Sequence, residues 1–510
     1  MIDRYKHKIK TLDEIKLLVE QADLLRRDVV VCNGCFDLVH PGHIRHFAYA
    51  KQYAPIILVL LTSDTHVNKG PNRPYVPQEL RALNLAALDL IDYVVINESK
   101  RPDDALQIIQ PAFYAKGFEY DAANRNGKSI GEEDIVRAYG GEVIYTPGDY
   151  IYSSSAIINS EPPDIRVDKL KLVMDRYRTT FDDLRDCLNK MNQKVVHVIG
   201  DIIVDSYTRC SMIGGQTKTP TMSVKYEEQL NYVGGAGIVA KHMRAAGAAV
   251  AFSTVVGNDK LGEFVLNDLM QYGIDVLPFV DPLRPTTNKN SIVVDNYRLL
   301  KVDTLDNRTI SDEALFEIMT AIKDYSCEIV VLADFRHGIF NKRTIPQIIS
   351  SIPSTTFKVA DSQVASRWGN ILDFPEFDLI TPNEREARFS LGDQDSGVRP
   401  LASKLYDASK CKTLMLKLGE RGMMVCVNNN HEDRDSFFAV DSFAREIVDP
   451  VGAGDALLAY ASLAMACSSN PAIAAILGTF AAGMECELDG NIPINAELVL
   501  KRINEVERNF

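Results

Sequence analysis

This sequence of 510 residues lacks the long apolar runs that membrane proteins carry. No stretch of about 18 consecutive apolar residues occurs, so no membrane-spanning helix is expected. The first ten residues are charged and have no apolar core, which argues against a secretory signal peptide. A cytoplasmic location is therefore expected, with no membrane partner.

The chain also lacks an excess of positive charge and a regular cysteine spacing. Its 56 Lys and Arg residues are outnumbered by 69 Asp and Glu residues, and the net charge is −13. Electrostatics therefore gives no support for a nucleic-acid partner. The nine cysteines are scattered, several of them in apolar runs, which indicates reduced thiols rather than a disulfide framework.

What the sequence does contain is an alternation of apolar strands and amphipathic helices. A hydrophobic content of 46% and a charged content of 25% are typical of a soluble globular protein, and 510 residues are too many for one core. An amphipathic helix is expected over 11–27. Strands are expected at 28–33, 55–62, 92–96, 112–116 and 142–146, with helices at 42–52, 78–90, 103–109 and 130–139. This alternation favours an α/β fold with a doubly wound parallel sheet.

The clearest boundary is Ser160-Glu161-Pro162-Pro163-Asp164, where two prolines interrupt both periodicities. A mostly polar helix is expected over 166–191, and a second α/β pattern starts at Val195. We predict a first domain at 1–159, a linker with a helix at 160–192, and a second doubly wound domain at 193–510. Alternating patterns at 219–233 and 289–303 indicate either a small β lid over a sugar site or an ordinary edge hairpin.

The chemistry of the first domain is concentrated in His40-Pro41-Gly42-His43, which follows a strand and a turn and opens a helix. Two imidazoles beside the N–H groups of a helix N-terminus form a site for polyphosphate, which indicates nucleotidyl transfer with loss of pyrophosphate. One alternative is a helix start with two surface histidines. The other is a zinc site with Cys32 and Cys35, although the gap between the two histidines is shorter than the usual finger spacing.

The second domain carries Asp449-Pro450-Val451-Gly452-Ala453-Gly454-Asp455 before an apolar helix. The glycines let backbone N–H groups turn inward and form an anion hole for a transferring phosphoryl group. Asp455 is placed to accept a proton from an attacking hydroxyl. The alternative is a glycine-rich turn in which Asp455 only caps the helix.

Three further turns, each after an apolar run, support this interpretation. Gly234 and Gly235 can bring backbone amides close to a sugar ring. Asn383 and Glu386 offer an amide and a carboxylate that could hold Mg²⁺ or its waters. The turn Lys417-Leu418-Gly419-Glu420-Arg421-Gly422 would bound a nucleotide pocket.

Taken together, these motifs resemble two known families. Residues 28–159 resemble the His-x-Gly-His nucleotidyltransferases, in particular ADP-heptose synthase modules, and residues 195–500 resemble the ribokinase-like sugar kinases, in particular heptose-7-phosphate kinase modules. Both activities occur fused in bifunctional enzymes of lipopolysaccharide assembly. The matching motifs are Asn33-Gly34-Cys35-Phe36-Asp37-Leu38, His40-x-Gly42-His43, Lys69-Gly70, Arg73-Pro74, Lys116-Gly117 with Tyr120, Gly140-Gly141-Glu142-Val143 and Ser153-Ser154-Ser155, then Gly200-Asp201 with Asp205, Gly234-Gly235-Ala236, Asn383 with Glu386, and Gly452-Ala453-Gly454-Asp455.

The resemblance implies phosphorylation of a sugar phosphate at its anomeric hydroxyl, followed by nucleotidyl transfer to the sugar 1-phosphate. It implies Mg²⁺, held through water by Asn383 and Glu386, ATP or another nucleoside triphosphate, and a homodimer or higher homo-oligomer. Asp37 either keeps the base or a histidine in register or only caps the turn. The implied catalytic residues are Asp455, His40, His43 and Lys69; the nucleotide and phosphate contacts are Asn33, Gly34, Cys35, Phe36, Asp37, Gly42, Lys116, Gly117, Ser153, Ser154, Ser155, Lys417, Gly419, Gly422, Gly452, Ala453 and Gly454; the substrate contacts are Asp201, Asp205, Gly234, Gly235 and Arg73.

The chain departs from the family pattern in four places. The kinase comes second here, whereas it comes first in the familiar bifunctional enzyme. Gly237-Ile238 stands where the sugar turn usually continues Ala-Asn, Asp361-Ser362-Gln363 replaces the usual Asp-Pro-Lys, and 214–220 replaces an acidic stretch. The sugar and the base therefore stay open. Alternatives are a cytidylyltransferase fused to another sugar or polyol kinase, or one domain that only binds nucleotide as a scaffold.

Overall fold

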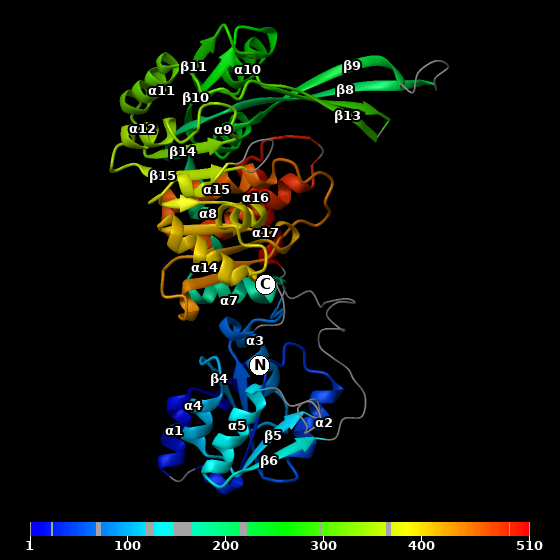
Figure 1. The fold of residues 1–510 in the computed structure, drawn as a ribbon, viewed down its shortest axis with the longest axis vertical. Helices are drawn as coiled ribbons and strands as arrows, with labels where there is room; N and C mark the ends of the chain where they lie inside the picture. Colours follow the sequence, from blue (N-terminus) through cyan, green and yellow to red (C-terminus); the bar gives the residue numbers. More distant parts are fainter. Residues whose placement is uncertain are drawn as a thin grey trace. The chain divides into compact units, whose positions relative to one another are not determined.

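The computed structural model describes residues 2–21, 24–67, 73–117, 127–146, 166–214, 222–295, 297–363, 369–488 and 490–508. The chain divides into two compact units, Met1–Ile165 and Arg166–Phe510. In Figure 1 the first is coloured blue to cyan and the second teal through green to red. Each unit is an α/β structure whose main sheet is predominantly parallel, as the sequence predicts.

The first unit is built around a six-stranded sheet in which every pair is parallel. Its strands are β1 (Ile9–Lys10), β2 (Val29–Gly34), β3 (Ile56–Thr62), β4 (Tyr93–Asn97), β5 (Phe113–Gly117) and β6 (Glu142–Thr146), and its α-helices are α1 (Leu12–Glu20), α2 (Pro41–Ala50), α3 (Gln78–Ala86), α4 (Asp103–Ile109) and α5 (Gly127–Ala138). The strand order is β1-β4-β3-β2-β5-β6. The chain therefore leaves β2 in one direction and returns to its other side at β5, and sheets of this kind bind ligands at the carboxyl ends of such strands.

The helix expected over 11–27 is shorter than predicted, because α1 ends at Glu20. The backbone N–H of Leu24 donates to the carbonyl oxygen of Leu18 at 3.0 Å, which turns the chain off the helix axis. This turn buries the Leu24 side chain against the sheet. The last part of the expected helix is a short 3₁₀ turn, Arg26–Asp28, that leads into β2.

The second unit is built around a nine-stranded sheet in the order β11-β10-β7-β14-β15-β16-β17-β18-β19. The strands from β11 to β17 pair in parallel, and β18 and β19 are added antiparallel at one edge. These strands are β7 (Val195–Gly200), β10 (Ala249–Gly257), β11 (Asp275–Asp281), β14 (Ile329–Asp334), β15 (Phe357–Ser362), β16 (Leu379–Ile380), β17 (Thr413–Lys417), β18 (Met423–Cys426) and β19 (Phe437–Val440). Again the order reverses around the first strand, at the carboxyl end of β7.

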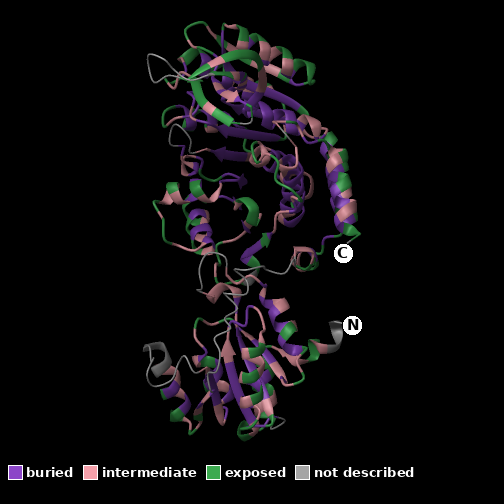
Figure 2. Ribbon diagram, turned by 90° about the vertical axis from the view of Figure 1, so that its right-hand side faces the viewer, coloured by how far each residue is buried: buried purple, intermediate pink, exposed green. Residues whose placement is uncertain are grey.

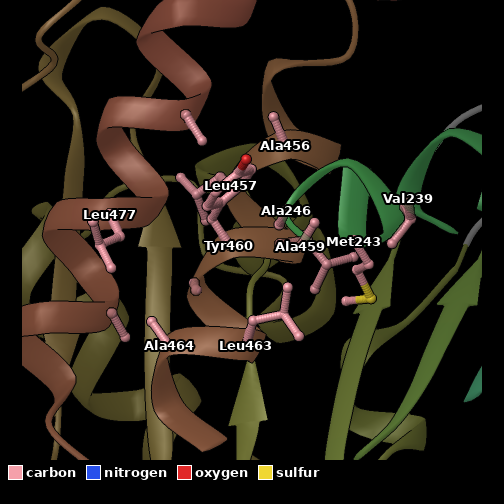
Figure 3. Packing of buried hydrophobic residues seen from close by; sticks show 14 of the residues in the cluster. Val239, Met243, Ala246, Ala456, Leu457, Ala459, Tyr460, Leu463, Ala464 and Leu477 are labelled. Atoms are coloured by element: carbon pink, nitrogen blue, oxygen red, sulfur yellow. The ribbon is translucent and has the colours of Figure 1, made fainter. Parts of the chain in front are cut away.

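The helices of the second unit cover this sheet, and its strands are buried, as the purple ribbon in Figure 2 shows. They are α7 (Arg166–Arg176), α8 (Phe181–Lys190), α9 (Ala236–Ala245), α10 (Lys260–Gln271), α11 (Asp312–Asp324), α12 (Thr344–Ser351), α13 (Glu384–Leu391), α14 (Val398–Ser409), α15 (Ala453–Ser468), α16 (Pro471–Cys486) and α17 (Ala496–Glu507). Figure 3 shows α15 packed between α9 and α16, with alanines such as Ala459 and Ala464 at the contacts. Small side chains let these helices approach closely. Among the described residues, no helix combines the length and the apolar character needed to cross a membrane.

The single polar helix predicted over 166–191 is wrong, because the structure has two helices there. Arg178 adopts a left-handed backbone with φ of 48°, which ends the helical path after α7. Thr180 then caps α8 by accepting a hydrogen bond from the N–H of Asp183, whose carboxylate accepts one from the N–H of Thr180. Both helices bury one face against the rest of the second unit. The polar residues of this segment therefore lie on the outer faces of the two helices.

A separate four-stranded sheet extends from the main body of the second unit (Figure 1). Its strands are β8 (Ile202–Gly214), β9 (Ser223–Gly235), β12 (Asn288–Val294) and β13 (Tyr297–Thr304), in the order β13-β12-β8-β9. The sequence predicted strands at 219–233 and 289–303, of which 219–221 and 296 lie outside the described residues. It did not predict β8, and β8 pairs with β12 in parallel rather than antiparallel. We call these four strands the lid sheet.

Candidate active sites

In the first unit, the two histidines of the His-x-Gly-His motif cap the start of α2. The Nδ1 atom of His40 accepts a hydrogen bond from the N–H of Gly42 at 3.1 Å, and Nδ1 of His43 accepts one from the N–H of His40 at 3.4 Å. The two rings lie 3.8 Å apart between centroids. A Cβ atom at position 42 would lie 2.8 Å from Cε1 of His40, so only glycine fits this cap.

This arrangement determines which nitrogen of each ring carries the proton. Because Nδ1 of both His40 and His43 accepts from the backbone, the neutral rings carry their proton on Nε2. Both rings therefore keep an N–H donor on the side away from the cap. Phe36, which has a φ of 43°, contacts the edge of His43 with ring centroids 5.1 Å apart and holds that ring from behind. Two imidazole donors at a helix N-terminus suit the oxygens of a polyphosphate.

Two of the predicted contact residues, Asp37 and Arg73, pair with each other. Asp37 is buried and accepts from Nη1 of Arg73 at 2.7 Å and from the backbone N–H groups of Tyr75 and Val76 at 3.0 and 2.8 Å. The pair therefore fastens the segment after 72 to the turn that follows β2. These bonds reach residues outside the turn that contains Asp37, so they differ from the simple turn cap that was one of its two expected roles.

The other side of the first site is formed at the carboxyl ends of β5 and β6. Lys116 is buried, and its Nζ lies 2.9 Å from a carboxylate oxygen of Glu132 on α5. His46 on α2, which sequence reasoning missed, contacts the hydroxyl of Thr146 through Nδ1 at 3.1 Å, and burial lowers its pKa to about 4. His46 is therefore neutral at physiological pH, and it joins α2 to β6. Its signal in the sequence was its place one turn after His43.

Several predicted residues cannot be placed. Lys69, Tyr120 and the serines Ser153, Ser154 and Ser155 lie outside the described residues. Asn33, Gly34 and Cys35 stand at the end of β2 and in its turn, and Gly117 ends β5, so these four lie at the predicted edge. In the part of the chain that the structure describes, no group of three or more His, Cys, Asp or Glu side chains could hold a metal. Burial raises the pKa of Cys32, which also disfavours a thiolate ligand for zinc.

In the second unit, the turn Gly452-Ala453-Gly454 forms the start of α15. Gly452 has a φ of 89°, and the backbone N–H groups of Asp455 and Ala456 donate to its carbonyl oxygen, both at 2.9 Å. The first N–H groups of α15 are left for a ligand, as at any helix N-terminus. Asp455 stands at the third helical position, half-buried, so it is not the residue that begins the helix.

The charges around Asp455 hold it ready to accept a proton. Burial and the nearby carboxylates of Asp361, Asp205 and Glu386 raise its pKa to about 7, against the opposing effect of Lys417. A carboxylate with such a pKa is a stronger base than an ordinary aspartate, and about half of it is ionised at neutral pH.

A buried lysine completes this side of the second site. Nζ of Lys417, at the end of β17, lies 2.9 Å from Oδ1 of Asp361 at the end of β15. Burial lowers the pKa of Lys417, but the carboxylates of Asp361, Glu386 and Asp455 outweigh it and raise the pKa overall. A Cβ atom at Gly454 would lie 3.5 Å from Nζ of Lys417, so the ammonium group stands next to the anion turn. The sequence predicted a nucleotide contact for Lys417, whereas Asp361 was noted only as part of a departure from the family pattern.

The predicted magnesium residues interact first with each other. Asn383 caps α13: its side chain accepts from the N–H of Glu386, and Oε2 of Glu386 accepts from the N–H of Asn383 at 2.7 Å. Asn383 is also bridged to Lys417 as in a parallel sheet. Gly419 and Gly422 form a tight turn beyond Lys417, with Gly422 at φ of 81°.

The sugar turn lies against the lid sheet and the anion turn. A Cβ atom at Gly234 would lie 2.1 Å from Oδ2 of Asp205 and 3.6 Å from Nδ2 of Asn491, while one at Gly452 would lie 2.5 Å from Oδ1 of the same Asn491. The structure thus brings Asp205, Gly234 and Gly452 together, and their sugar and phosphate contacts stay predictions. Gly235, at φ of 59°, begins α9.

Asp201 is buried, and unlike Asp205 its carboxylate is occupied by hydrogen bonds from the backbone. Its two carboxylate oxygens accept from three backbone N–H groups of the loop after β14, those of Phe335, His337 and Ile339, at 3.1 to 3.3 Å. It therefore shapes the edge of the site by holding this loop. Sequence reasoning also missed Asn491 and Glu485; the signal for Glu485 was that it is the single charged residue of α16.

Comparison with known proteins bears on both units. Residues 193–492 match the family described as pfkB family carbohydrate kinase, and residues 31–209 match the one described as cytidylyltransferase-like. The second match runs past the boundary between the units into β7 and β8.

Curated relatives include two bifunctional proteins HldE. The one from Nitratiruptor is 27% identical over 324 residues, which are 61% of this chain and 65% of that protein. The one from Geobacter metallireducens is 39% identical over 138 residues, 27% of each chain. The chain thus covers less than two thirds of either relative. Phosphofructokinase-2 from Escherichia coli in complex with potassium superposes with a TM-score of 0.51 and 16% identity, over 62% of this chain and 99% of that one, which shows a shared fold.

Proposed function

Because the chain belongs to the pfkB family of carbohydrate kinases, we propose that its second unit transfers the γ-phosphoryl group of ATP to a sugar hydroxyl and that its first unit joins the product to a nucleotide. The observation that carries this proposal is Asp455, a carboxylate with a raised pKa at the start of α15 beside the Gly452 turn. Asp455 takes the proton of the sugar hydroxyl, which attacks the γ-phosphorus in line. The N–H groups of the turn and Lys417 stabilise the developing negative charge.

Magnesium would enter this site with the nucleotide. Asn383 and Glu386 fit a water-mediated contact rather than direct ligation, since each already accepts a backbone hydrogen bond from the other. Mg²⁺ keeps several waters and is usually bound by one or two carboxylates together with substrate phosphates. When bound, the ion would neutralise charge on the phosphates.

The cationic side chains on the lid sheet favour an acceptor substrate that itself carries a phosphate. Lys289 on β12 lies directly opposite Asp205 on β8 and Asp303 on β13, so these side chains share one face of the sheet. Arg298 lies on the same face, 5.7 Å above the ring of Tyr207. Burial and the ammonium of Lys301 lower the pKa of Lys289, against the opposing carboxylates of Asp205 and Asp303. Three cations, Lys289, Lys301 and Arg298, act on Asp205 beside the sugar turn.

The first unit would then use the anomeric phosphate made by the kinase. That phosphate attacks the α-phosphorus of a nucleoside triphosphate, and pyrophosphate leaves. The Nε2–H groups of His40 and His43 donate to phosphate oxygens as charge builds up, with Lys69 and Ser153 to Ser155 proposed as further contacts. The acceptor would be similar to heptose 7-phosphate and the product similar to ADP-heptose. A homodimer or higher homo-oligomer is part of this proposal.

The deciding experiment gives the protein ATP as the phosphoryl donor, together with each nucleoside triphosphate and each acceptor in turn, and identifies the products by mass spectrometry. The panel contains ATP, CTP, GTP and UTP against heptose 7-phosphate, mannose 6-phosphate, mannose and glycerol. We expect a nucleotide sugar and pyrophosphate from heptose 7-phosphate with ATP. A CTP-derived product from glycerol would instead identify a cytidylyltransferase with a polyol kinase.

The variant Asp455→Asn separates the two units. We expect its phosphoryl transfer to fall by about 10²- to 10⁴-fold, the usual loss of a general base. Nucleotidyl transfer to a supplied sugar 1-phosphate should be unchanged. Unchanged sugar-dependent ATP consumption by Asp455→Asn would refute the kinase assignment.

A further inference from the structure

Glu485 is a buried carboxylate without a hydrogen-bonding partner. It stands in the last turn of α16, its side chain is fully buried, and neither of its oxygens has a hydrogen-bond partner in the described part of the chain. An ionised carboxylate in such a place destabilises the folded state, because no charged or hydrogen-bonding group replaces the lost water. The group therefore requires an explanation.

The position of Glu485 is directly behind the anion turn of the kinase site. A Cβ atom on Gly452 would lie 2.8 Å from Oε1 of Glu485 and 2.5 Å from Oδ1 of Asn491. That amide oxygen is also buried and unpartnered among the described residues. Two acceptor oxygens, one from each residue, thus lie beside the same glycine, and a hydrogen on Glu485 would give them a shared hydrogen bond. The backbone N–H of Ile492 also acts on the Glu485 carboxylate and lowers its pKa, but burial outweighs it.

No cation in the described residues compensates Glu485. The charged groups that act on it are Asp455 on α15 and Asp449 before α15, both negative. On α17, Arg502 is paired with Glu487 and Glu505, and on α8, Arg185 is paired with Asp182 and Glu507. The strands β18 and β19, which also pack on α16, contain no ionisable side chain other than Cys426. The carboxyl end of α16 adds negative potential of its own.

We propose that Glu485 is protonated in the active kinase and that its O–H group donates to Oδ1 of Asn491, so that this neutral pair fixes the Gly452 turn. Glu485 is then a positioning residue, and the inference rests on the proposed kinase function. Backbone hydrogen bonds tie the same region together, because Val448 and Asp449 both donate to the carbonyl oxygen of Cys486. Burial, reinforced by Asp455 and Asp449, raises the pKa of Glu485 to about 8.

The two carboxyl groups have opposite requirements. Asp455 must lose its proton to act as a base, whereas Glu485 must keep its proton to hold the turn. Ionised Glu485 would place a negative charge directly behind N–H groups that receive a triphosphate. The kinase should therefore be active between about pH 7 and about pH 8 and decline on both sides.

The test compares the pH dependence of kcat for ATP-dependent sugar phosphorylation in the wild type and in Glu485→Gln. Glutamine keeps a donor for Asn491 and cannot ionise. One pH unit above its alkaline midpoint, the wild type should have lost about tenfold in kcat, while Glu485→Gln should have lost little. Glu485→Met, which has no donor, should lower kcat at every pH and leave the KM for the sugar unchanged. Glu487→Gln, two residues away and paired with Arg502, is the matched control and should keep the alkaline decline.

Each other outcome overturns the inference. If the alkaline decline persists in Glu485→Gln, a group other than Glu485 causes that decline. A folded Glu485→Gln protein that is inactive at every pH shows that the negative charge is needed. A wild-type activity that requires potassium chloride, tested against tetramethylammonium chloride, and that Glu485→Gln no longer responds to, shows that a cation occupies the place of the proton. If the wild type phosphorylates no sugar, it is the proposed function that fails.

A measurement of stability covers the case in which kinetics cannot be compared. A carboxyl group whose pKa is raised on folding stabilises the protein below its unfolded pKa, and this contribution is lost as the pH rises through about 8. The melting temperature of Glu485→Gln should therefore rise relative to the wild type as the pH goes from about 5 to about 8. Parallel melting curves for the two proteins over that range would contradict a proton on Glu485.

Discussion

The two proposed phosphate sites both lie at the start of a helix, but they are built in opposite ways. In the first unit the start of α2 is organised by its own neighbours, since His40 and His43 bond backbone groups two and three residues away. In the second unit the start of α15 is organised by residues far apart in the chain, such as Asp205, Lys417 and Glu485. The first site is locally determined and its hydrogen bonds are made; the second is assembled by the fold and contains buried charge.

Replacing Gly452 in the turn of the second unit should have the largest effect. Gly452→Ala combines a φ of 89° with contacts to Glu485 and Asn491, so the whole turn must move. We expect kcat for phosphoryl transfer to fall by about 10²- to 10³-fold, the loss typical of a disrupted anion hole. Initial-rate assays of ATP-dependent sugar phosphorylation measure this fall in kcat.

Gly392→Ala is the matched control for that variant. Gly392 also has a positive φ, 62°, but a Cβ there meets nothing within 4 Å. It should cost about 1 kcal/mol of stability and leave phosphoryl transfer unchanged. Equal losses of kcat in the two variants would mean that strain, and not the groups behind Gly452, limits the kinase.

His43→Ala should break the first site with a smaller effect that stays within that unit. Removing one donor to the developing charge, and with it the bond to the N–H of His40, should lower pyrophosphate release by about 10²-fold. Phosphoryl transfer should not change. His46→Ala, whose ring contacts Thr146 instead, is the control and should lose much less. Loss of kinase activity in His43→Ala would contradict independent sites.

The lid cations predict a more modest and selective change. Lys289→Met should raise the KM for heptose 7-phosphate by about 10- to 100-fold, the worth of a charged hydrogen bond, with little change for mannose. Lys225→Met, on β9 toward the other end of the lid sheet, should leave both KM values unchanged. Equal effects on the phosphorylated and the free sugar would mean that Lys289 does not contact the phosphate.

The smallest expected effect is the acid limb of the kinase. Asp455 must be ionised, and burial raises its pKa to about 7, so kcat should rise about tenfold per pH unit below that value and stop rising above it, before the alkaline decline attributed to Glu485. In the described part of the first unit the carboxyl with a raised pKa, Asp64, is paired with Arg81, so the rate of the nucleotidyl transfer proposed there should not follow the same limb. Coincident acid limbs for both reactions would point to a shared limiting step.

This contrast also explains how much the sequence could predict. Five of the six strands of the first unit, all but β1, and the His40 turn were predicted from short spacings, because strand pattern and helix capping are local properties. The segment 166–191 was misjudged because a left-handed residue at Arg178 leaves no periodic signal. Glu485, Asn491 and the partner of Lys417 became visible only in the fold, since strand order decides which distant side chains meet.

The way the lid sheet is connected has a mechanical consequence. β8 begins at Ile202, immediately after Asp201, and β9 ends at Gly235, where α9 begins. Both lid strands are therefore direct extensions of the floor of the sugar site, with no slack chain between them. We therefore expect a movement of the free end of the lid sheet to displace Asp205 and Gly234. In turn, we expect sugar binding at these residues to restrict that movement.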